Sequence, residues 1–203
     1  MSATNPSSSS RNVSRPNCLG GILSVPGDKS ISHRSLILNG IAYGDAFVQG
    51  LSSGDDVLST IHCLQAMGVS IEYTGQTGSY RIIGCGPQLA EPADILDAGN
   101  SGTSIRLLSG VLASQPFVSI ITGDGSLRTR PMRRIVQPLE QMGAQIMGRE
   151  ENTLAPLVFR GGTLHGIEYD LPMASAQVKS AIILAGLSAS SKTVIHQPAL
   201  SRD

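Results

Sequence analysis

The sequence predicts an α/β fold in which one module, a helix, a strand, a second helix and two further strands, is repeated. Two glycine-rich segments, Gly27-Asp-Lys-Ser-Ile-Ser-His-Arg34 and Gly99-Asn-Ser-Gly-Thr-Ser-Ile-Arg106, share small hydroxyl residues, a base and an apolar run. A helix end also recurs, as Leu64-Gln-Ala-Met-Gly-Val-Ser-Ile71 and Leu139-Glu-Gln-Met-Gly-Ala-Gln-Ile146. Both pairs recur at about the same spacing, which indicates a duplicated supersecondary unit.

Hydrophobic periodicity and turn residues place the elements in order. The first module is predicted as helix 30–43, strand 46–51, helix 55–67 and strands 69–74 and 79–84. The second is predicted as helix 101–114, strand 117–122, helix 131–142 and strands 144–148 and 156–160. A third begins with strand 166–171, helix 175–189 and strand 193–197. It lacks a second helix, so we expect the chain to be truncated within a module.

The first helix of each module is apolar on almost every side, as in 31–42 and 178–187. Such a helix is expected to be enclosed by protein. The second helices are more amphipathic, with Arg133, Arg134 and Glu140 available to face solvent. We therefore expect buried helices with the sheets outside.

The composition is that of an ordinary folded protein with a sizeable core. Of 203 residues, 40% are hydrophobic and 15% charged, and the 15 basic and 15 acidic residues cancel. Aromatic residues make up only 3%, so neither a nucleic acid nor a membrane surface is expected as a partner. The sequence has neither a membrane-length apolar stretch nor the apolar core of a secretory signal. We expect a cytoplasmic protein.

The N-terminal residues 1–17 are rich in serine and are predicted to form a disordered tail. A transit peptide shares that composition but is usually longer. Cysteines and histidines are scattered without the spacing of a metal site, so we expect no metal and no cofactor; they are Cys18, Cys63, Cys85, His33, His62, His165 and His196.

The two glycine-rich segments fit the start of a helix that binds an anion. A first helical turn has unpaired N–H groups and the positive end of the dipole, and small residues let an anion approach them. Ser30 and Ser101 can cap such turns, while Lys29, Arg34 and Arg106 add positive charge. The segments predict sites for phosphate or carboxylate. The alternative is a pair of ordinary capped helices with solvated bases.

Five segments, in order along residues 22–203, resemble the 3-phosphoshikimate 1-carboxyvinyltransferase (5-enolpyruvylshikimate-3-phosphate synthase) family. They are Pro26-Gly-Asp-Lys-Ser-Ile-Ser-His-Arg34, Gly99-Asn-Ser-Gly-Thr-Ser-Ile-Arg106, Gly123-Asp-Gly-Ser-Leu-Arg-Thr-Arg-Pro-Met132, Ala174-Ser-Ala-Gln-Val-Lys-Ser180 and Leu200-Ser-Arg-Asp203. The resemblance implies two domains of βαβαββ units with helices inside. Residues 26–203 would form most of the first domain, with modules near 26–95 and 96–163 and an incomplete one at 164–203. Residues 18–25 would form a strand of the split second domain.

The resemblance also implies an activity and a set of site residues. The family transfers the enolpyruvyl group of phosphoenolpyruvate to the 5-hydroxyl of shikimate 3-phosphate and releases phosphate. Shikimate 3-phosphate would be bound by Lys29, Ser30, Arg34, Ser175, Ala176, Gln177 and Ser201. Phosphoenolpyruvate would be bound by Lys29, Gly102, Arg130 and Gln177, with Lys29 also catalytic. The resemblance further implies a monomer for the full-length enzyme.

The principal catalytic carboxylates of the family would lie in a second half outside this chain, so we expect the 203 residues alone to be inactive. The four carboxylates near the motifs are expected only to cap helices or to lie in solvated loops; they are Asp28, Asp55, Asp56 and Asp124. Two positions depart from many members, Ala176 for serine and Leu107 for proline. Gly102 matches members sensitive to glyphosate, a competitor of phosphoenolpyruvate, and Leu107 puts the degree of sensitivity in doubt.

Three alternatives to this function remain open to the sequence. UDP-N-acetylglucosamine enolpyruvyl transferase shares the fold and the donor but lacks the Asp-Lys-Ser-x-Ser-x-Arg start that is present at 28–34. RNA 3′-phosphate cyclase has similar modules but calls for nucleotide chemistry and a more basic surface. The third alternative is a non-catalytic module that binds anions and acts only as half of a larger protein.

Overall fold

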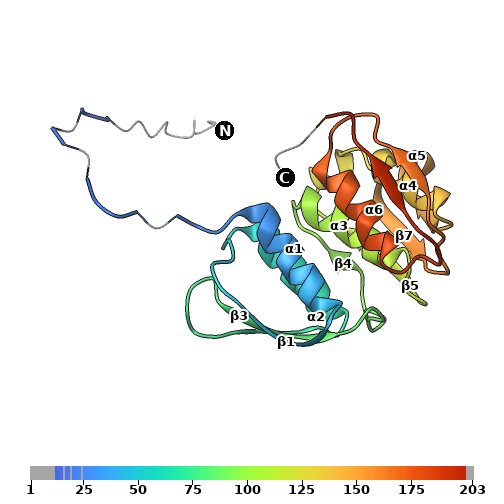
Figure 1. Ribbon diagram of the computed structural model, residues 1–203, viewed down its shortest axis with the longest axis horizontal. Helices are drawn as coiled ribbons and strands as arrows, with labels where there is room; N and C mark the ends of the chain where they lie inside the picture. Colours follow the sequence, from blue (N-terminus) through green and yellow to red (C-terminus); the bar gives the residue numbers. More distant parts are fainter. Residues whose placement is uncertain (1–11, 16, 19, 24, 200–203) are drawn as a thin grey trace, which may run out of the picture.

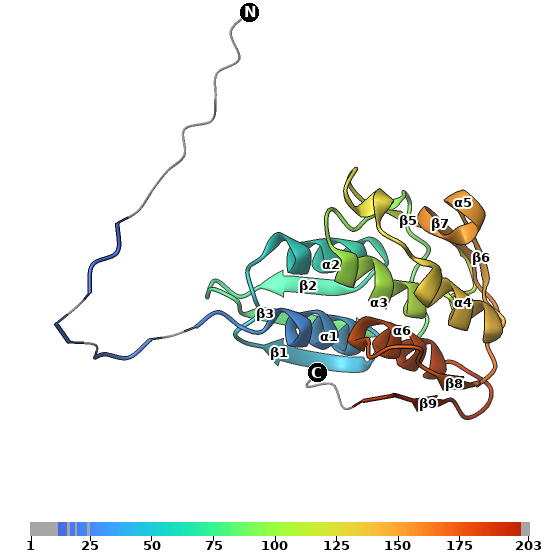
Figure 2. The ribbon, with the colours of Figure 1, turned by 90° about the horizontal axis from the view of Figure 1, so that it is seen from above.

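The computed structural model describes residues 12–15, 17–18, 20–23 and 25–199, and it contains three modules in chain order (Figures 1 and 2). The first module comprises α1 (Lys29–Gly40), β1 (Tyr43–Val48), α2 (Asp55–Ala66), β2 (Ser70–Tyr73) and β3 (Tyr80–Cys85). Its strands form an antiparallel sheet in the order β1-β3-β2.

The second module is a complete βαβαββ unit, as the family resemblance implies. It comprises β4 (Leu96–Asp97), α3 (Gly102–Leu112), β5 (Val118–Thr122), α4 (Arg133–Gln141), β6 (Gln145–Gly148) and β7 (Leu154–Arg160), with short turns η1 (Leu127–Thr129) and α5 (Arg149–Asn152). The sheet order is β4-β5-β7-β6, and only the β4–β5 pair is parallel. The third module is a βαβ unit of β8 (Glu168–Asp170), α6 (Ala176–Gly186) and β9 (Val194–His196), with parallel strands.

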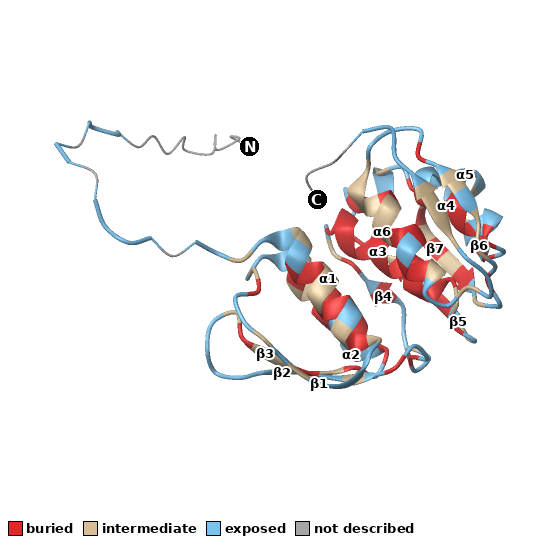
Figure 3. Ribbon diagram, viewed as in Figure 1, coloured by how far each residue is buried: buried red, intermediate tan, exposed pale blue. Residues whose placement is uncertain are grey.

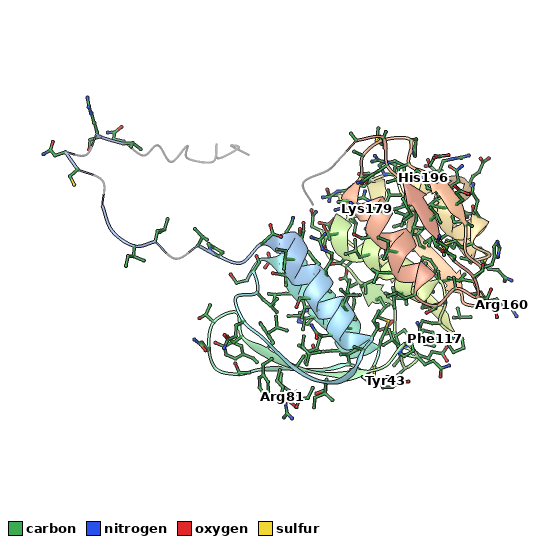
Figure 4. The ribbon with its side chains drawn as sticks, in the orientation of Figure 1. Tyr43, Arg81, Phe117, Arg160, Lys179 and His196 are labelled. Carbon is green, nitrogen blue, oxygen red and sulfur yellow. The ribbon has the colours of Figure 1, made fainter. Side chains whose placement is uncertain are left out.

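The sheets of the first two modules bury one face against the helices, which confirms the predicted layering. In the first sheet, Ile71 and Ile82 lie on the buried face, whereas Phe47 and Tyr43 are exposed on the other. On that outer face Arg81 of β3 binds Asp45 of β1 with three hydrogen bonds of 2.6–3.1 Å (Figure 4). The second sheet buries Leu157 and other alternating side chains of β7 in the same way.

Helix α3 is the innermost element of the described fold, because α1 and α2 pack on one side of it and α4 and α6 on the other. Ten of its eleven residues are buried (Figure 3). The prediction that the first helices are enclosed on every side is therefore correct for α3. It is wrong for α1 and α6 in the described part of the chain, where Ile31 is 62% exposed and Ile183 is 49% exposed. These two helices flank α3 and receive neighbours on fewer sides.

Most element boundaries agree with the sequence predictions to within two or three residues. The largest shift is in β1, which was expected at 46–51 and begins at Tyr43. Gly44 and Asp45 have the composition of a turn, yet the bond between Asp45 and Arg81 holds them in the edge strand. The two-residue strand β4 and the turns η1 and α5 were not predicted, because such short segments carry no periodicity.

The described residues before α1 are in no helix or strand, and nearly all of them are exposed. Within 18–25, the segment predicted as a strand of a second domain, the described residues form no strand. Its assignment to that domain stays a prediction. Most of the expected tail, residues 1–11 and 16, lies outside the described residues.

Candidate functional site

Three helices, α1, α3 and α6, begin close together at one end of the molecule beside the start of α2, and the first turns of these three contain most of the predicted site residues. Hydrogen bonds connect the starts in series. Gln177 of α6 donates to Thr103 of α3 (2.9 Å), and Ser104 of α3 donates to the backbone carbonyl of Asp56 in α2 (3.1 Å). Asp56 in turn forms an ion pair with Lys29 at the start of α1 (2.8 Å). Figure 1 shows α1, α3 and α6 running in the same direction.

Each helix start is capped by a short polar side chain. Ser101 accepts a hydrogen bond from the Ser104 amide at 3.0 Å, as predicted. The prediction of Ser30 as a cap is wrong, because Asp28 caps α1 by accepting from the Ile31 amide at 2.7 Å. Ser175 caps α6 by accepting from the Val178 amide at 3.5 Å. These caps use one amide each and leave others in the first turns available to an anion.

Two guanidinium groups lie directly over the backbone of Gly102. A Cβ atom built there would lie 2.7 Å from Nη1 of Arg106 and 3.3 Å from Nη1 of Arg130. Only glycine at this position lets both groups approach the helix start. Arg106 was named in the sequence only as a nearby charge, and the structure adds it to the site. Its signal was its spacing in the motif, one helical turn after Gly102.

Neutral oxygen atoms hold both guanidinium groups in place. Arg106 donates to the side-chain oxygen of Gln177 (2.8 Å) and to the backbone carbonyls of Gly102 (3.3 Å) and Pro131. Arg130 donates to the backbone carbonyl of Asn100 (3.1 Å) and to its side-chain oxygen. Among the described residues neither arginine forms an ion pair. The charge of Arg106 is therefore held without a direct carboxylate partner, whereas Arg130 interacts with the carboxylate of Asp124 beyond ion-pair distance.

The pKa of Arg106 is lowered, chiefly by desolvation and then by the positive charges of Arg134 and Arg130. The positive charges of Arg106, Arg130 and Arg134 therefore repel one another, and a bound anion would stabilise all three. Arg134 in α4 contributes to the same field, and its guanidinium donates to the sulfur of Met173 at 3.0 Å, which is a weak acceptor. A phosphate or carboxylate at Gly102 would relieve the repulsion and accept charge-assisted hydrogen bonds.

The four acidic residues near the motifs take four different positions. Asp28 caps α1, as expected, whereas Asp55 neither caps a helix nor lies in a loop but is exposed in the first turn of α2. Asp124 accepts from the side chain of Asn100 (2.6 Å) and from the amide of Leu127, which lowers the pKa of its carboxyl group. Asp56 neither caps a helix nor lies free in solvent, because its carboxylate pairs with Lys29.

The predicted shikimate 3-phosphate residues are brought together only in part. Lys29, Ser30 and Arg34 share the first turns of α1, and Arg34 follows Ser30 by one helical turn. Ala176 and Gln177 begin α6. Ser201 lies outside the described residues, so its predicted role in binding stays a prediction.

The described residues contain no cluster of three or more side chains suited to hold a metal ion. None of the helices in the described part of the chain is long and apolar enough to cross a membrane.

Comparison with known proteins gives the same family along nearly the whole chain. The model of the EPSP synthase (3-phosphoshikimate 1-carboxyvinyltransferase) family matches residues 13–203. Among curated relatives of that name, one from Herpetosiphon aurantiacus is 53% identical over 94% of this chain, and one from Magnetococcus marinus is 54% identical over 100% of it. These alignments cover 44% and 45% of the relatives, so the chain spans less than half of their length.

Solved structures agree with this comparison. EPSP synthase from Acinetobacter baumannii superimposes on 90% of this chain with a TM-score of 0.87 and 51% identity, and the match covers 41% of that protein.

Proposed function

Because the chain belongs to the EPSP synthase family, we propose that it forms one wall of an active site for 3-phosphoshikimate 1-carboxyvinyl transfer. In that reaction the 5-hydroxyl of shikimate 3-phosphate adds to C2 of phosphoenolpyruvate while C3 gains a proton. The 5-hydroxyl gives up its proton in this addition, and loss of a proton from the C3 methyl group and of phosphate from C2 then leaves the enolpyruvyl ether. The observation that carries the proposal is the pair of guanidinium groups over Gly102, which neutral oxygen atoms hold without an ion pair.

The roles proposed for individual residues follow from their charge and position. Arg130 and the first turn of α3 would hold phosphoenolpyruvate, because a planar guanidinium fits a carboxylate or phosphate with two hydrogen bonds. Gln177 would lie beside this ligand, since it already bonds both Arg106 and Thr103. Lys29 would be shared by both substrates, because it lies at the start of α1 and reaches Asp56 in α2.

Shikimate 3-phosphate is proposed to bind across the starts of α1 and α6. Ser30 and Arg34 would contribute from α1, and Ser175, Ala176 and Gln177 from α6. The backbone amide of Ala176 can donate where other members have a serine hydroxyl. The cytoplasmic location and the monomeric state of the full-length enzyme stay predictions, the latter open to light scattering.

The test is calorimetric titration of the 203-residue chain with shikimate 3-phosphate, alongside Arg34→Ala. We expect binding by the unchanged chain and an affinity lower by roughly 10-fold or more in the variant, because one charge-assisted hydrogen bond contributes about 1.5–3 kcal/mol. Arg160→Ala is the matched control, since it removes the same charge at the far end of β7 (Figure 4).

Equal affinity in Arg34→Ala and the unchanged chain would contradict the assignment of Arg34. Failure of the unchanged chain to bind would contradict the idea that this wall is formed independently. A parallel titration with UDP-N-acetylglucosamine should give no binding, and a preference for that sugar would favour the other enolpyruvyl transferase.

A further inference from the structure

A buried chain of hydrogen bonds connects the first three helices and contains a histidine to which the proposed reaction assigns no role. The ring nitrogen Nδ1 of His33 in α1 lies 2.7 Å from the hydroxyl of Thr60 in α2. That hydroxyl lies 2.7 Å from the hydroxyl of Ser104 in α3. All three side chains belong to residues with no exposed surface. Buried polar groups with defined partners fix a unique arrangement of the elements that carry them.

The direction of these bonds can be deduced by counting protons. The Ser104 hydroxyl has one proton, and its other two neighbours are the backbone carbonyl of Asp56 (3.1 Å) and the hydroxyl of Ser101 (2.7 Å). If that proton goes to either of them, Ser104 must accept from Thr60. The proton of Thr60 is then used, so Thr60 must accept from His33. With the Ser104 proton on either of these two acceptors, the ring of His33 is protonated on Nδ1 and is a donor.

The other ring nitrogen is consistent with this assignment. Nε2 of His33 is buried and has no hydrogen-bond partner among the described residues. In the Nδ1–H form this atom is an unprotonated acceptor, whereas in the opposite form it would be a buried donor without an acceptor. Unpaired buried N–H groups are the rarer of the two in folded proteins. The burial of the ring also lowers the pKa of His33 to about 4, with Lys29 and Arg34 adding to the shift and Asp56 opposing it.

The chain of bonds ends at the residues that form the two anion sites. Ser101, which Ser104 contacts, caps α3 immediately before Gly102. Asp56, whose carbonyl lies 3.1 Å from the hydroxyl of Ser104, pairs through its carboxylate with Lys29. His33 itself lies one turn after Lys29 on α1. The starts of α1 and α3 are thus held relative to each other by two routes through α2.

We propose that His33 is a positioning residue, which as an Nδ1–H donor fixes the start of α1 relative to the start of α3 through Thr60 and Ser104. Its role is to keep Lys29 and Gly102 at the separation that two adjacent anionic substrates require. This inference rests on the proposed function in one respect, namely that both helix starts bind substrate. The tautomer and the mechanical connection can be measured without any ligand.

The first measurement is the tautomeric state of His33 in the 203-residue chain labelled with ¹⁵N-histidine. The His33→Asn variant identifies the signal, because the other three histidines remain. We expect a neutral ring with the proton on Nδ1 at pH 7. A ring protonated on Nε2, or an even mixture of the two forms, would overturn the proposal. A side chain that served only to fill space would show no fixed tautomer.

The second measurement compares backbone amide chemical shifts in Thr60→Val, Thr60→Ser and Ser109→Ala. Valine keeps the shape of threonine without the hydroxyl, so it should shift amides at both helix starts, near Ser30 and Gly102. Serine should restore the original shifts. Ser109 is the matched control, because its buried hydroxyl bonds only within α3, to the carbonyl of Ile105 (2.6 Å). Shifts confined to α2 in Thr60→Val would contradict the connection.

A titration with shikimate 3-phosphate separates the two proposals. We expect Thr60→Val to weaken binding about fivefold or more, and Thr60→Ser to bind like the unchanged chain. If the unchanged chain does not bind, this wall is not formed independently, and the tautomer and the amide shifts still decide the role of His33. If Thr60→Val is folded and binds with unchanged affinity, the positioning role is wrong and the proposed function stands.

Discussion

Arg106 and Arg130 are held over Gly102 by carbonyl and amide oxygens rather than by carboxylates. A carboxylate partner would neutralise each guanidinium and would have to be displaced by an anionic ligand. Neutral oxygens orient the same groups and leave the charge available. Lys29 is the exception, because it pairs with Asp56, and its side chain is about half exposed. An ion pair this open to solvent is weak, so a substrate anion can compete for Lys29.

A methyl group at Gly102 should weaken anion binding while the fold persists. In Gly102→Ala the new atom would displace the ends of two flexible arginine side chains, and alanine also favours the helix. We expect a roughly 10-fold lower affinity for phosphoenolpyruvate and for glyphosate by calorimetry, with stability changed by less than about 1 kcal/mol. Gly54→Ala at the start of α2 is the control, because its Cβ would meet only Ser52 at 3.7 Å. Unchanged affinity in Gly102→Ala would show that Gly102 does not contribute to anion binding.

The burial of His33 should make the protein less stable in mild acid. Its pKa is about 4 in the folded chain and 6.5 in the unfolded one, so only the unfolded state gains a proton between these values. Stability is therefore complete above about pH 6.5, falls as the pH is lowered toward 4 and is flat below that, for a total of about 3 kcal/mol. Urea unfolding at pH 7 and pH 5 measures the loss, which should be much smaller in His33→Asn.

His196 has the opposite effect on the pH dependence of stability, so its contribution must be measured separately from that of His33. Glu168 raises the pKa of the exposed His196 by hydrogen bonding, so His196 adds stability at low pH and loses it as the pH rises. His196→Gln removes that contribution, so the total loss of stability between pH 7 and pH 5 should be larger in this variant. An equal pH dependence in His33→Asn and the unchanged chain would show that the ring is not buried as described.

Sequence motifs indicated charged and hydroxyl residues for the candidate site, whose binding roles stay predictions, but they did not indicate the partners of these residues. Lys29, Gly102, Arg130 and Gln177 lie at adjacent helix starts or loops, as their motifs indicate. The pairing of Lys29 with Asp56 could not be predicted, because the two are 27 residues apart and belong to different helices. The role of His33 was missed for the same reason. Its partner Thr60 lies in a helix without any recognisable motif.

At the level of the helices, α3 and α6 pack so closely that one glycine is required between them. A Cβ atom at Gly110 would lie 2.2 Å from the backbone carbonyl oxygen of Ala181 and 3.1 Å from its Cα. These are backbone atoms, so neither can turn away. Because Gln177 of α6 contacts both Thr103 and Arg106 of α3, this spacing also sets the geometry of the anion site.

Gly110→Ala should therefore destabilise the protein although alanine is the better helix former. We expect a loss of about 1–3 kcal/mol in urea unfolding, the usual result of overpacking a core. Gly162→Ala is the control, because no atom lies within 4 Å of its Cβ. A Gly110→Ala variant as stable as this control would mean that the two helices are farther apart than described.

The long helices and strands were predictable from periodicity, and the repeat placed most of them in two modules. Their surroundings were less predictable. The apolar residues of α1 and α6 resemble those of α3, yet Ile31 and Ile183 remain exposed. Periodicity shows how apolar each side of a helix is. The packing of the modules decides which of those sides contact other elements. That packing is long-range and leaves no local pattern.

For the molecule as a whole, the residues of the candidate site come from three different modules. The first module supplies Lys29, the second supplies Gly102 and Arg130, and the third supplies Gln177. The duplicated glycine-rich segments thus become two neighbouring helix starts, joined through α2. Under the proposed function, each helix start would hold one anionic substrate, and this division would follow from the arrangement of the modules rather than from either motif alone.

The 203-residue chain should bind substrate but catalyse no transfer. The reaction needs a group to deliver a proton to C3 of phosphoenolpyruvate and one to accept a proton from the 5-hydroxyl. Among the described residues at the site, the Asp56 carboxylate pairs with Lys29, and the lowered pKa of Asp124 leaves its carboxyl group ionised near neutral pH, without a proton to deliver. His33 is buried and already bonded to Thr60. We expect no release of phosphate above background from a mixture of both substrates, with a full-length relative as the positive control. Phosphate release in proportion to the concentration of this chain, and its loss in Lys29→Met, would show instead that the described wall contains the whole catalytic machinery.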